Sequence, residues 1–584
     1  MEKRYQLNQI FGRNPDSLIN LVKISVIIIA GIYLIGNFTP YYEAKDAYLY
    51  GIEAINFSKG IYSMSNVLLE ETGRMEFVGD NYRKTIHGDA VPSSGVGTPL
   101  LGALAYMIGG YYGLFYLGPI LGILFLIIFE RISTKLFGKY VGLLSLLFLT
   151  TCHIVFRSAV LPNTDAILTL FFIPGIYYLI KFFKNKDEKT IFLASTFFAI
   201  ASLVKIPGIV YFPLELVLIL GYVVYQKINQ RKLSSEWKWK NKINKKKILK
   251  ISVLLFIPWI IFFGFWFSYN NYYYGGPTTT YLSVKYGVEI SSSSHIGTLF
   301  VIEQRDFDQF KDYSKYLLPY QIPATYNKVT NNFDDVLGKH WPGLISPLII
   351  LLALVVSFKQ KEKRIEILVM SSFIAGIIWF FAGQSSVERA SVGLPARFML
   401  PALSLFFIVL SYLIIKILKS EFIHKNPFGN KKTKIFRNFV IVILGVFFIG
   451  AFYFTPPIQM FISEDIQFKD PRIFAERYPL DTSQIPENSI IVSHHNDWAI
   501  DYGAIPFVLH FQHGINPESV SLLKKSVSEG YDAFIFKQPT VKGEKSTWSN
   551  LAENYDLVFI EHSEKFCRII ISEDKESDSV CMEE

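Results

Sequence analysis

The sequence predicts a polytopic α-helical membrane protein that ends in a small α/β domain, on three observations. Of the 584 residues, 51% are hydrophobic and the mean hydropathy is +0.30, which is too apolar for a soluble protein of this length. Apolar runs long enough for a helix to cross a bilayer, about 20 residues, recur over most of the chain. The net charge of +9 comes mostly from short loops between these runs, where it signals orientation, so nucleic acid binding is excluded.

About 11 transmembrane helices are expected from these runs. They lie at 21–38, 111–130, 140–158, 166–183, 191–206, 209–226, 251–268, 343–358, 365–382, 398–417 and 438–455. Thr98 to Ile108 is interpreted as a membrane-lying helix, since a single crossing at 111–130 keeps the following basic residues on the side of the basic N-terminus. Two of the spans are expected to meet at an outer hairpin around Lys205 and Pro207.

With these spans, the basic loops all fall on the cytoplasmic side, namely 181–189, 227–250, 359–364 and 416–437. Residues 1–20 form a cytoplasmic N-terminal segment and 21–455 a transmembrane catalytic domain. The large loops 39–98 and 269–341 and the domain 456–584 are extracytoplasmic. The composition, rich in Lys, Ile and Asn, is typical of an AT-rich microbial genome. For a prokaryotic source, the predicted location is the plasma membrane, with many crossings.

The last 130 or so residues change character. Short β-rich runs alternate there with a helix-like segment at 517–529, which indicates an α/β domain. The runs lie at 489–493, 532–536, 557–560 and 567–572. Of the three cysteines, Cys152 lies in an apolar span, so only Cys567 and Cys581 could share a compartment. Unpaired thiols near the terminus are the favoured expectation for these two, and a disulfide between them is the alternative.

The stretch 39–98 is the predicted roof of an active site at the membrane surface. It gathers acids and bases within a chain that is otherwise apolar, namely Glu43, Asp46, Asp89, Arg83, Lys84 and His87. Asp46 follows the first span, and Asp165 begins the fourth after a Pro-Asn-Thr turn. Asp165 could simply cap its helix and favour the helix dipole. Two acids at the mouths of two spans at one membrane face instead favour a functional role.

Cations are expected at the same face. Lys205 lies at the hairpin, Arg397 precedes a span, and Arg157 lies near the outer end of another. Each alone could snorkel to the interface. Together with Arg83 and Lys84 they indicate a site for an anionic head group, because Arg binds phosphate through paired hydrogen bonds. Carboxylates and cations at the lipid boundary suit a substrate with an anionic head and an apolar tail, such as a lipid phosphate.

Several segments in order resemble motifs of a known enzyme group. Asp46 to Ala54, followed by Gly60, resembles an acidic motif in which Ala47 stands where a Glu is usual, so that the role of the second acid is unfilled or passes to Glu43. Further matches are Gly97-Thr98-Pro99-Leu100, Phe156-Arg157 through Leu168, Val204 to Gly208, Asn270 to Tyr281, and Ala396-Arg397-Phe398-Met399-Leu400-Pro401. Over residues 20–455 the chain is similar to the GT-C glycosyltransferases of the protein O-mannosyltransferase and aminoarabinose transferase group.

That resemblance implies a GT-C fold and transfer of a hexose or pentose from a polyprenyl-phosphate carrier, dolichyl phosphate included, with inversion at the anomeric carbon. Asp46 would be the base and Asp165 would orient the acceptor, the sugar or a basic partner. Lys205 and Arg397, with Arg83 and Lys84, would bind the donor phosphate, supported by Glu43, Arg157 and His87. No cofactor is required, and a divalent metal is not predicted. The membrane lipids and the lipid-linked donor are the expected partners.

Three alternatives remain open at this stage. A transporter or flippase would carry paired charges near the middle of the bilayer and short loops. A non-catalytic scaffold that presents the C-terminal domain would need no acids at the outer membrane face. An oligosaccharyltransferase would use a lipid-pyrophosphate donor and a metal-binding acid pair. The acceptor is a hydroxyl of a protein Ser or Thr, of a glycan or of a lipid, and the sequence does not distinguish them.

Overall fold

The computed structural model describes the helical region in most of its length and the C-terminal region in parts. The described residues are 15–38, 45–63, 66–72, 82–92, 96–160, 164–233, 245–276, 342–360, 363–382, 399–419, 442, 485–486, 489–492, 505–507, 517–536, 557–562 and 566–571. The chain divides into two compact units, which are considered separately.

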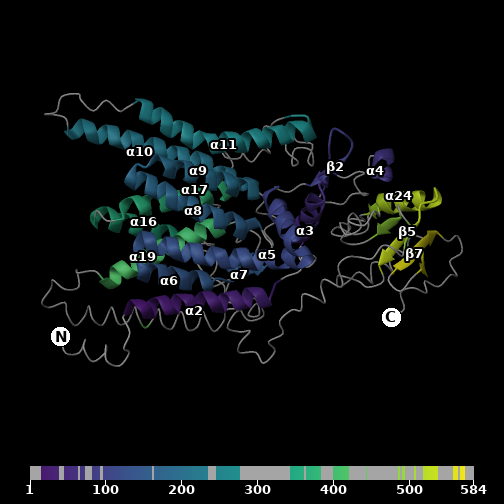
Figure 1. The fold of residues 1–584 in the computed structure, drawn as a ribbon, viewed down its shortest axis with the longest axis horizontal. Coiled ribbons are helices and arrows are strands. Elements are labelled where there is room, and N and C mark those ends of the chain that lie inside the picture. Colours follow the sequence, from purple (N-terminus) through teal and green to yellow (C-terminus); the bar gives the residue numbers. More distant parts are fainter. Residues whose placement is uncertain are drawn as a thin grey trace. The chain divides into compact units, whose positions relative to one another are not determined.

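The first unit is a bundle of apolar helices (Figure 1). It contains α2 (Pro15–Gly36), α6 (Lys139–Thr150), α7 (His153–Val160), α8 (Thr164–Asn185), α9 (Glu188–Val204), α10 (Tyr211–Leu233), α16 (Pro342–Gln360), α17 (Arg364–Ala382), α19 (Leu400–Lys419), and the larger parts of α5 (Gly97–Phe137) and α11 (Lys245–Tyr274). Five described helices are long and apolar enough to cross a membrane, namely α2, α5, α8, α11 and α19. The predicted span 438–455 lies, apart from Val442, outside the described residues.

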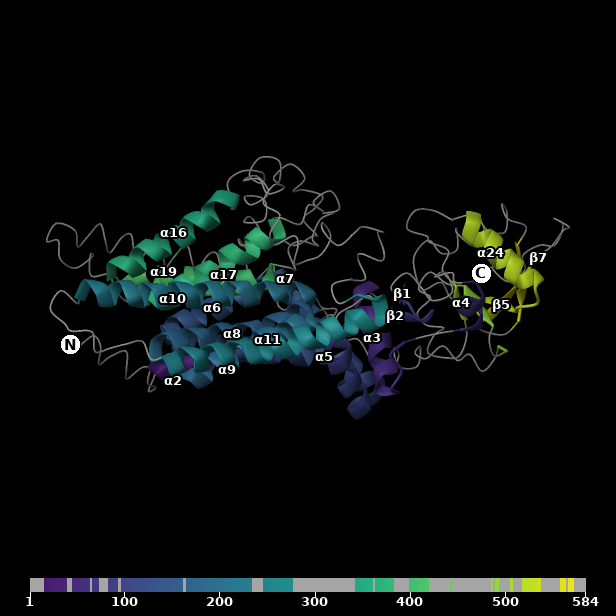
Figure 2. The same cartoon turned by 90° about the horizontal axis from the view of Figure 1, so that it is seen from above.

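Aromatic side chains fill the centre of this bundle. Helix α8 packs along α9, while α19 lies against α6 and α17 (Figures 1 and 2). Phe172, Phe198, Tyr211 and Phe373 form one contiguous ring cluster, with the Phe172 and Tyr211 centroids 4.6 Å apart. A Cβ at Gly175 would lie 2.5 Å from the Phe198 ring, so this glycine lets α8 and α9 approach closely.

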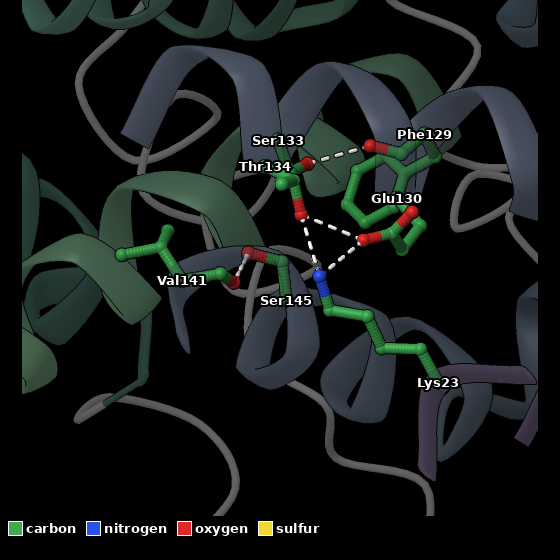
Figure 3. Close-up of polar contacts among 7 residues, drawn as sticks. All are labelled: Lys23, Phe129, Glu130, Ser133, Thr134, Val141 and Ser145. Carbon is green, nitrogen blue, oxygen red and sulfur yellow. Dashed lines mark hydrogen bonds and ion pairs between the residues drawn. The ribbon is translucent and has the colours of Figure 1, made fainter. Parts of the chain in front are cut away.

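A buried polar cluster joins α2 to α5 (Figure 3). Lys23 Nζ lies 2.6 Å from Glu130 Oε1 and donates to Thr134 Oγ1 at 2.8 Å. Thr134 in turn donates to Glu130 at 2.6 Å, so the three groups satisfy one another. A Cβ at Gly142 would meet the Thr134 hydroxyl at 2.0 Å, so α6 can lie beside the cluster only because that residue is glycine. The cluster fixes the two helices against each other away from water.

One predicted span is broken, whereas α5 bends where the sequence predicted two separate helices. The predicted span 140–158 is interrupted, because α6 ends at Thr150 and α7 begins at His153. At this break the Thr151 hydroxyl donates to the Phe148 carbonyl, a local bond that competes with continuation of the helix. Helix α5 bends at Gly110, where φ is 56° and ψ is −141°, so residues 97–109 are set apart from the span that follows.

The second unit joins loop segments to the C-terminal residues. It contains α3 (Lys45–Ser58), α4 (Val67–Thr72), the hairpin of β1 (Tyr82–Lys84) and β2 (Ala90–Pro92), the first part of α5, the end of α11, α24 (Pro517–Ser528), and the strands β3 (Ile490–Val492), β4 (Ile505–Phe507), β5 (Ala533–Phe536), β6 (Leu557–Glu561) and β7 (Phe566–Ile571). The five C-terminal strands form one sheet in the order β4-β3-β5-β7-β6. Strand β3 is parallel to β4 and β5, and β7 is antiparallel to its neighbours.

The core of this sheet includes a residue from the first loop. Leu68 of α4 is fully buried in one hydrophobic cluster with residues of the strands and of α24, among them Val520 and Ile535. The Tyr531 hydroxyl also lies 3.4 Å from the Glu71 carboxylate. Strands β3, β5, β6 and β7 overlap the four β-rich runs predicted from the sequence, whereas β4 was not expected.

The cysteine prediction was wrong at one position. Cys567 on β7 is buried and disulfide-bonded, whereas unpaired thiols were expected near the terminus. Cys152 is a buried free thiol, in agreement with its place in an apolar span. The expectation failed because sequence spacing alone does not show which cysteines lie close enough to pair.

Candidate functional site

The centre of the candidate site is an ion pair between Asp165 and Lys205. Lys205 Nζ donates to Asp165 Oδ1 at 2.6 Å, and the two side chains are 18% and 4% exposed. The charges therefore lie largely out of water, where an ion pair persists only with good geometry. Asp165 lies in the first turn of α8, which also favours a negative charge through the helix dipole.

The local sequence explains why Lys205 occupies a turn. Helix α9 ends at Val204, and Lys205 follows in an extended conformation with φ −149° and ψ 123°. Pro207, which lacks an N–H, is the second residue of the short 3₁₀ helix η3 (Ile206–Val210), after which α10 starts. A Cβ at Gly208 would lie 2.9 Å from the Ser202 backbone, so the turn is tight. The predicted hairpin between the two helices is confirmed.

A second group of predicted residues lies on the β1–β2 hairpin of the other unit. Arg83 and Lys84 are on β1, where the Lys84 side chain is exposed and the Arg83 side chain lies outside the described atoms. His87 is exposed in the turn, and its Nε2 lies 2.9 Å from the Tyr272 carbonyl oxygen. The Ile86 N–H also donates to the Tyr273 carbonyl at 2.9 Å. These bonds attach the hairpin to the end of α11.

Asp46 lies in the first turn of α3, and its side chain is outside the described atoms. The helix that carries it is tightly packed, since a Cβ at Gly102 of α5 would lie 2.6 Å from the Ala54 Cβ. Glu53, seven residues after Asp46, is 1% exposed. Next to it, burial raises the pKa of the Tyr62 phenol well above its ordinary value, with a smaller increase from the Glu53 carboxylate.

The remaining predicted residues are only partly placed. Arg157 lies on α7, with its side chain outside the described atoms. Glu43 and Arg397 both fall outside the described residues. The structure thus brings Asp165 and Lys205 together, and places Arg83, Lys84 and His87 on one hairpin.

Three buried acids in the described part of the chain were missed by the sequence reasoning, namely Glu53, Glu215 and Glu366. Glu53 was quoted within the acidic motif without a role, and its burial is a tertiary property. Glu215 is fully buried in α10, and the signal for it was available, because it is an acid within the apolar run 209–226. Among the described residues, no group of three or more His, Cys, Asp or Glu side chains is arranged to hold a metal ion.

Comparisons with known proteins agree with this architecture. Residues 104–262 match the family model described as dolichyl-phosphate-mannose-protein mannosyltransferase. No curated protein matches the chain in sequence. The structure of ArnT from Cupriavidus metallidurans bound to undecaprenyl phosphate is similar, with a TM-score of 0.50, 12% identity, and coverage of 96% of this chain and 99% of that one.

A second similar structure is AglB, the archaeal oligosaccharyltransferase from Archaeoglobus fulgidus, in complex with an inhibitory peptide and a dolichol-phosphate. It has a TM-score of 0.48 and 12% identity, and the match covers 94% of this chain and 74% of that one. The family match is confined to residues 104–262, and at 12% identity the likeness to ArnT shows a shared fold.

Proposed function

We propose that the protein transfers a sugar from a polyprenyl-phosphate carrier to a hydroxyl acceptor at the extracytoplasmic membrane face. The observation that carries this proposal is the buried Asp165–Lys205 pair, which holds a cation at the ends of two apolar helices. Such a cation suits the phosphate of a lipid-linked donor. The family match supports sugar transfer, and the ArnT structure was solved with a polyprenyl phosphate bound.

The proposed reaction is a single displacement. The acceptor oxygen attacks the anomeric carbon, and the bond from that carbon to the phosphate oxygen breaks with its electron pair. The carboxylate of Asp46 takes the proton of the acceptor hydroxyl. The products are the glycosylated acceptor, with inverted configuration, and the free polyprenyl phosphate.

The cations stabilise the leaving phosphate in this proposal. Lys205 and Arg397, assisted by Arg83 and Lys84 of the hairpin, counter the negative charge that grows on the phosphate oxygen. Of the three roles considered for Asp165, the 2.6 Å ion pair favours the orientation of a basic partner. Asp165 thereby acts through Lys205.

The proposed domain organisation places residues 456–584 outside the cytoplasm as a small α/β domain, next to a catalytic domain of about 11 membrane helices at 21–455. Disulfides persist in oxidising compartments, so the bonded Cys567 supports this side of the membrane. Leu68 lies in the core of the C-terminal sheet, which supports an extracytoplasmic position for loop 39–98 as well.

The experiment that tests the proposal is a transfer assay with purified protein in detergent. Radiolabelled polyprenyl-phosphate hexoses and pentoses are incubated with peptide, glycan and lipid acceptors, and polyprenyl-pyrophosphate oligosaccharides serve as the competing donor class. We expect turnover of a monophosphate donor, and a decrease of about 100-fold or more in kcat for Asp46→Asn. Exposed Glu70→Gln is the matched control. Turnover of the pyrophosphate donor alone, or equal turnover by Asp46→Asn, would contradict the proposal.

The same assay tests the absence of a metal requirement. A phosphate monoester carrier is a good leaving group once cations are positioned, so we propose that Lys and Arg side chains suffice. Activity is then expected to survive EDTA followed by desalting. Loss of activity with EDTA, restored by Mg²⁺ or Mn²⁺, would contradict this part of the proposal.

A further inference from the structure

The most deeply buried acid of the bundle lies on α10, away from the Asp165–Lys205 pair. Glu215 has an exposed fraction of 0%. Ser195 of α9 donates to its Oε1 at 2.8 Å, and Trp259 Nε1 of α11 donates to its Oε2 at 3.0 Å. Among the described residues these are its two hydrogen-bond partners, and no cation pairs with it. One carboxyl group thus links three membrane helices.

Packing alone does not explain an acid at this position. A buried carboxyl in apolar surroundings is costly unless its oxygens are hydrogen-bonded, whereas a leucine fills similar space without that cost. Here both oxygens have donors, and Trp259 is itself held in an aromatic cluster, with its ring 5.0 Å from that of Phe212. The two bonds therefore specify how α9, α10 and α11 align, rather than adding general stability.

The position of the acid in the chain connects it to the candidate site. Ser195 lies ten residues before Lys205, and Glu215 lies ten residues after it. Their hydrogen bond closes the helical hairpin that has Lys205 at its tip. A slip of α9 along α10 would move Lys205 relative to Asp165 on α8, and the bond between Ser195 and Glu215 opposes that slip.

We propose that Glu215 is a positioning residue, which acts through Ser195 and Trp259 to hold Lys205 in place. This inference rests on the proposed function. In the transferase, the position of Lys205 sets the affinity for the phosphate of the donor. Glu215 does not touch the reacting atoms. Its effect reaches the donor only through the position of the Lys205 ammonium group.

The test compares two substitutions of Glu215. In Glu215→Gln the amide oxygen accepts from Trp259, and the amide N–H donates to Ser195, whose hydroxyl can donate to the Ile191 carbonyl already 3.1 Å away. This variant is expected to behave like the wild type. Glu215→Leu removes both bonds and is expected to raise the donor KM about tenfold, with a smaller change in kcat. Ser195→Ala removes one bond and is expected to give an intermediate increase.

A matched control is Glu366→Leu. Glu366 is also a buried acid of the bundle, 2% exposed, but its partners are Lys184 and Lys363 rather than the Lys205 hairpin. The substitution Glu366→Leu is expected to lower the unfolding temperature without changing the donor KM. The double variant Glu215→Leu, Lys205→Met measures the coupling between the two residues. Once Lys205 is absent, Glu215→Leu should raise the donor KM little further.

A measurement that does not depend on sugar transfer separates this inference from the proposed function. Labelling of Lys205 by an amine-reactive ester, quantified by peptide mass spectrometry, reports whether the ammonium group remains in its pair. Glu215→Leu is expected to increase this labelling about threefold, while Glu215→Gln and Glu366→Leu leave it unchanged. Unchanged labelling and KM in Glu215→Leu would overturn the inference, as would equal effects for Glu366→Leu. Absence of transfer by the wild type, with the labelling pattern intact, would overturn only the proposed function.

Discussion

Asp165 and Lys205 lie 40 residues apart in the chain, yet form one buried unit with an N–O distance of 2.6 Å. Two simpler explanations had been available for these residues, a helix cap for the acid and snorkelling for the lysine. The pair is not explained by either, because each side chain is directed at the other rather than at its own helix end or at water. At the scale of single residues, the proposed function depends on this pairing of charges across helices.

Replacing Asp165 by Asn tests this pairing. The substitution removes the carboxylate charge 2.6 Å from the Lys205 ammonium while the lysine stays largely buried. Breaking a buried pair from one side costs about 3 kcal/mol, so a lower unfolding temperature and a higher donor KM are expected. Thermal unfolding in detergent and the transfer assay measure the two effects.

The control for this substitution is Asp187→Asn at the other end of α9. Asp187 caps that helix through a bond from the Lys189 N–H at 3.1 Å, and Asn caps equally well. Its stability and activity are expected to match the wild type. If Asp165→Asn behaved in the same way, the pair would have no part in the site.

At the scale of helices, small residues determine which elements approach closely. Gly122 of α5 would place a Cβ 2.6 Å from the Ala159 Cβ of α7, and Gly376 of α17 would place one 2.4 Å from Leu214 of α10. Gly102 does the same between α5 and α3, at 2.6 Å from Ala54. The last contact matters most for the proposed function, because α3 carries Asp46.

Substitution of Gly102 by Val is expected to push α3 away from α5. Overpacking of this kind costs about 2 kcal/mol, and the displaced helix moves Asp46, so both the unfolding temperature and kcat are expected to fall. Gly109→Ala is the matched control, since a Cβ there meets nothing within 4 Å. Equal kcat values for the two variants would show that the α3–α5 contact does not position Asp46.

At the scale of the whole molecule, the first loop and the C-terminal residues form one core. Leu68 is buried among residues of the sheet and α24, and Cβ-branched and aromatic side chains such as Ile490 and Phe559 surround it. A side chain in such a core cannot be separated from it by a bilayer. In the proposed topology, α4 and the sheet therefore lie on the same side of the membrane.

Leu68→Ala is expected to destabilise this core by about 3 kcal/mol, because a buried leucine is lost and a cavity remains. Limited proteolysis should then cleave residues 490–571 faster than in the wild type. The neighbouring substitution Glu70→Gln, at an exposed position, serves as the control and should leave the cleavage rate unchanged. If Leu68→Ala were cleaved no faster than the wild type, the shared core would not stabilise the sheet.

The predicted membrane orientation can be tested with single cysteines. Lys525 on α24 is 70% exposed and Lys250 on α11 is 64% exposed. In intact cells, a membrane-impermeant thiol reagent is expected to label Lys525→Cys but not Lys250→Cys, which becomes accessible after permeabilisation. The opposite pattern would invert the whole topology, and labelling of both would place them on one side.

The sequence by itself determined where most of the described apolar helices lie, since apolar length is a local property, but not the break between α6 and α7. It also located the Lys205 hairpin, because proline and glycine act on the backbone of their own segment.

Only the tertiary structure decided which side chains contact one another. These contacts include the choice of Asp165 for Lys205, the bonds of Glu215 to Ser195 and Trp259, the bonded state of Cys567 and the burial of Leu68. Each depends on which of many similar apolar helices and strands pack together. That choice follows from shape and polar pairing summed over distant segments, which no single stretch of sequence contains.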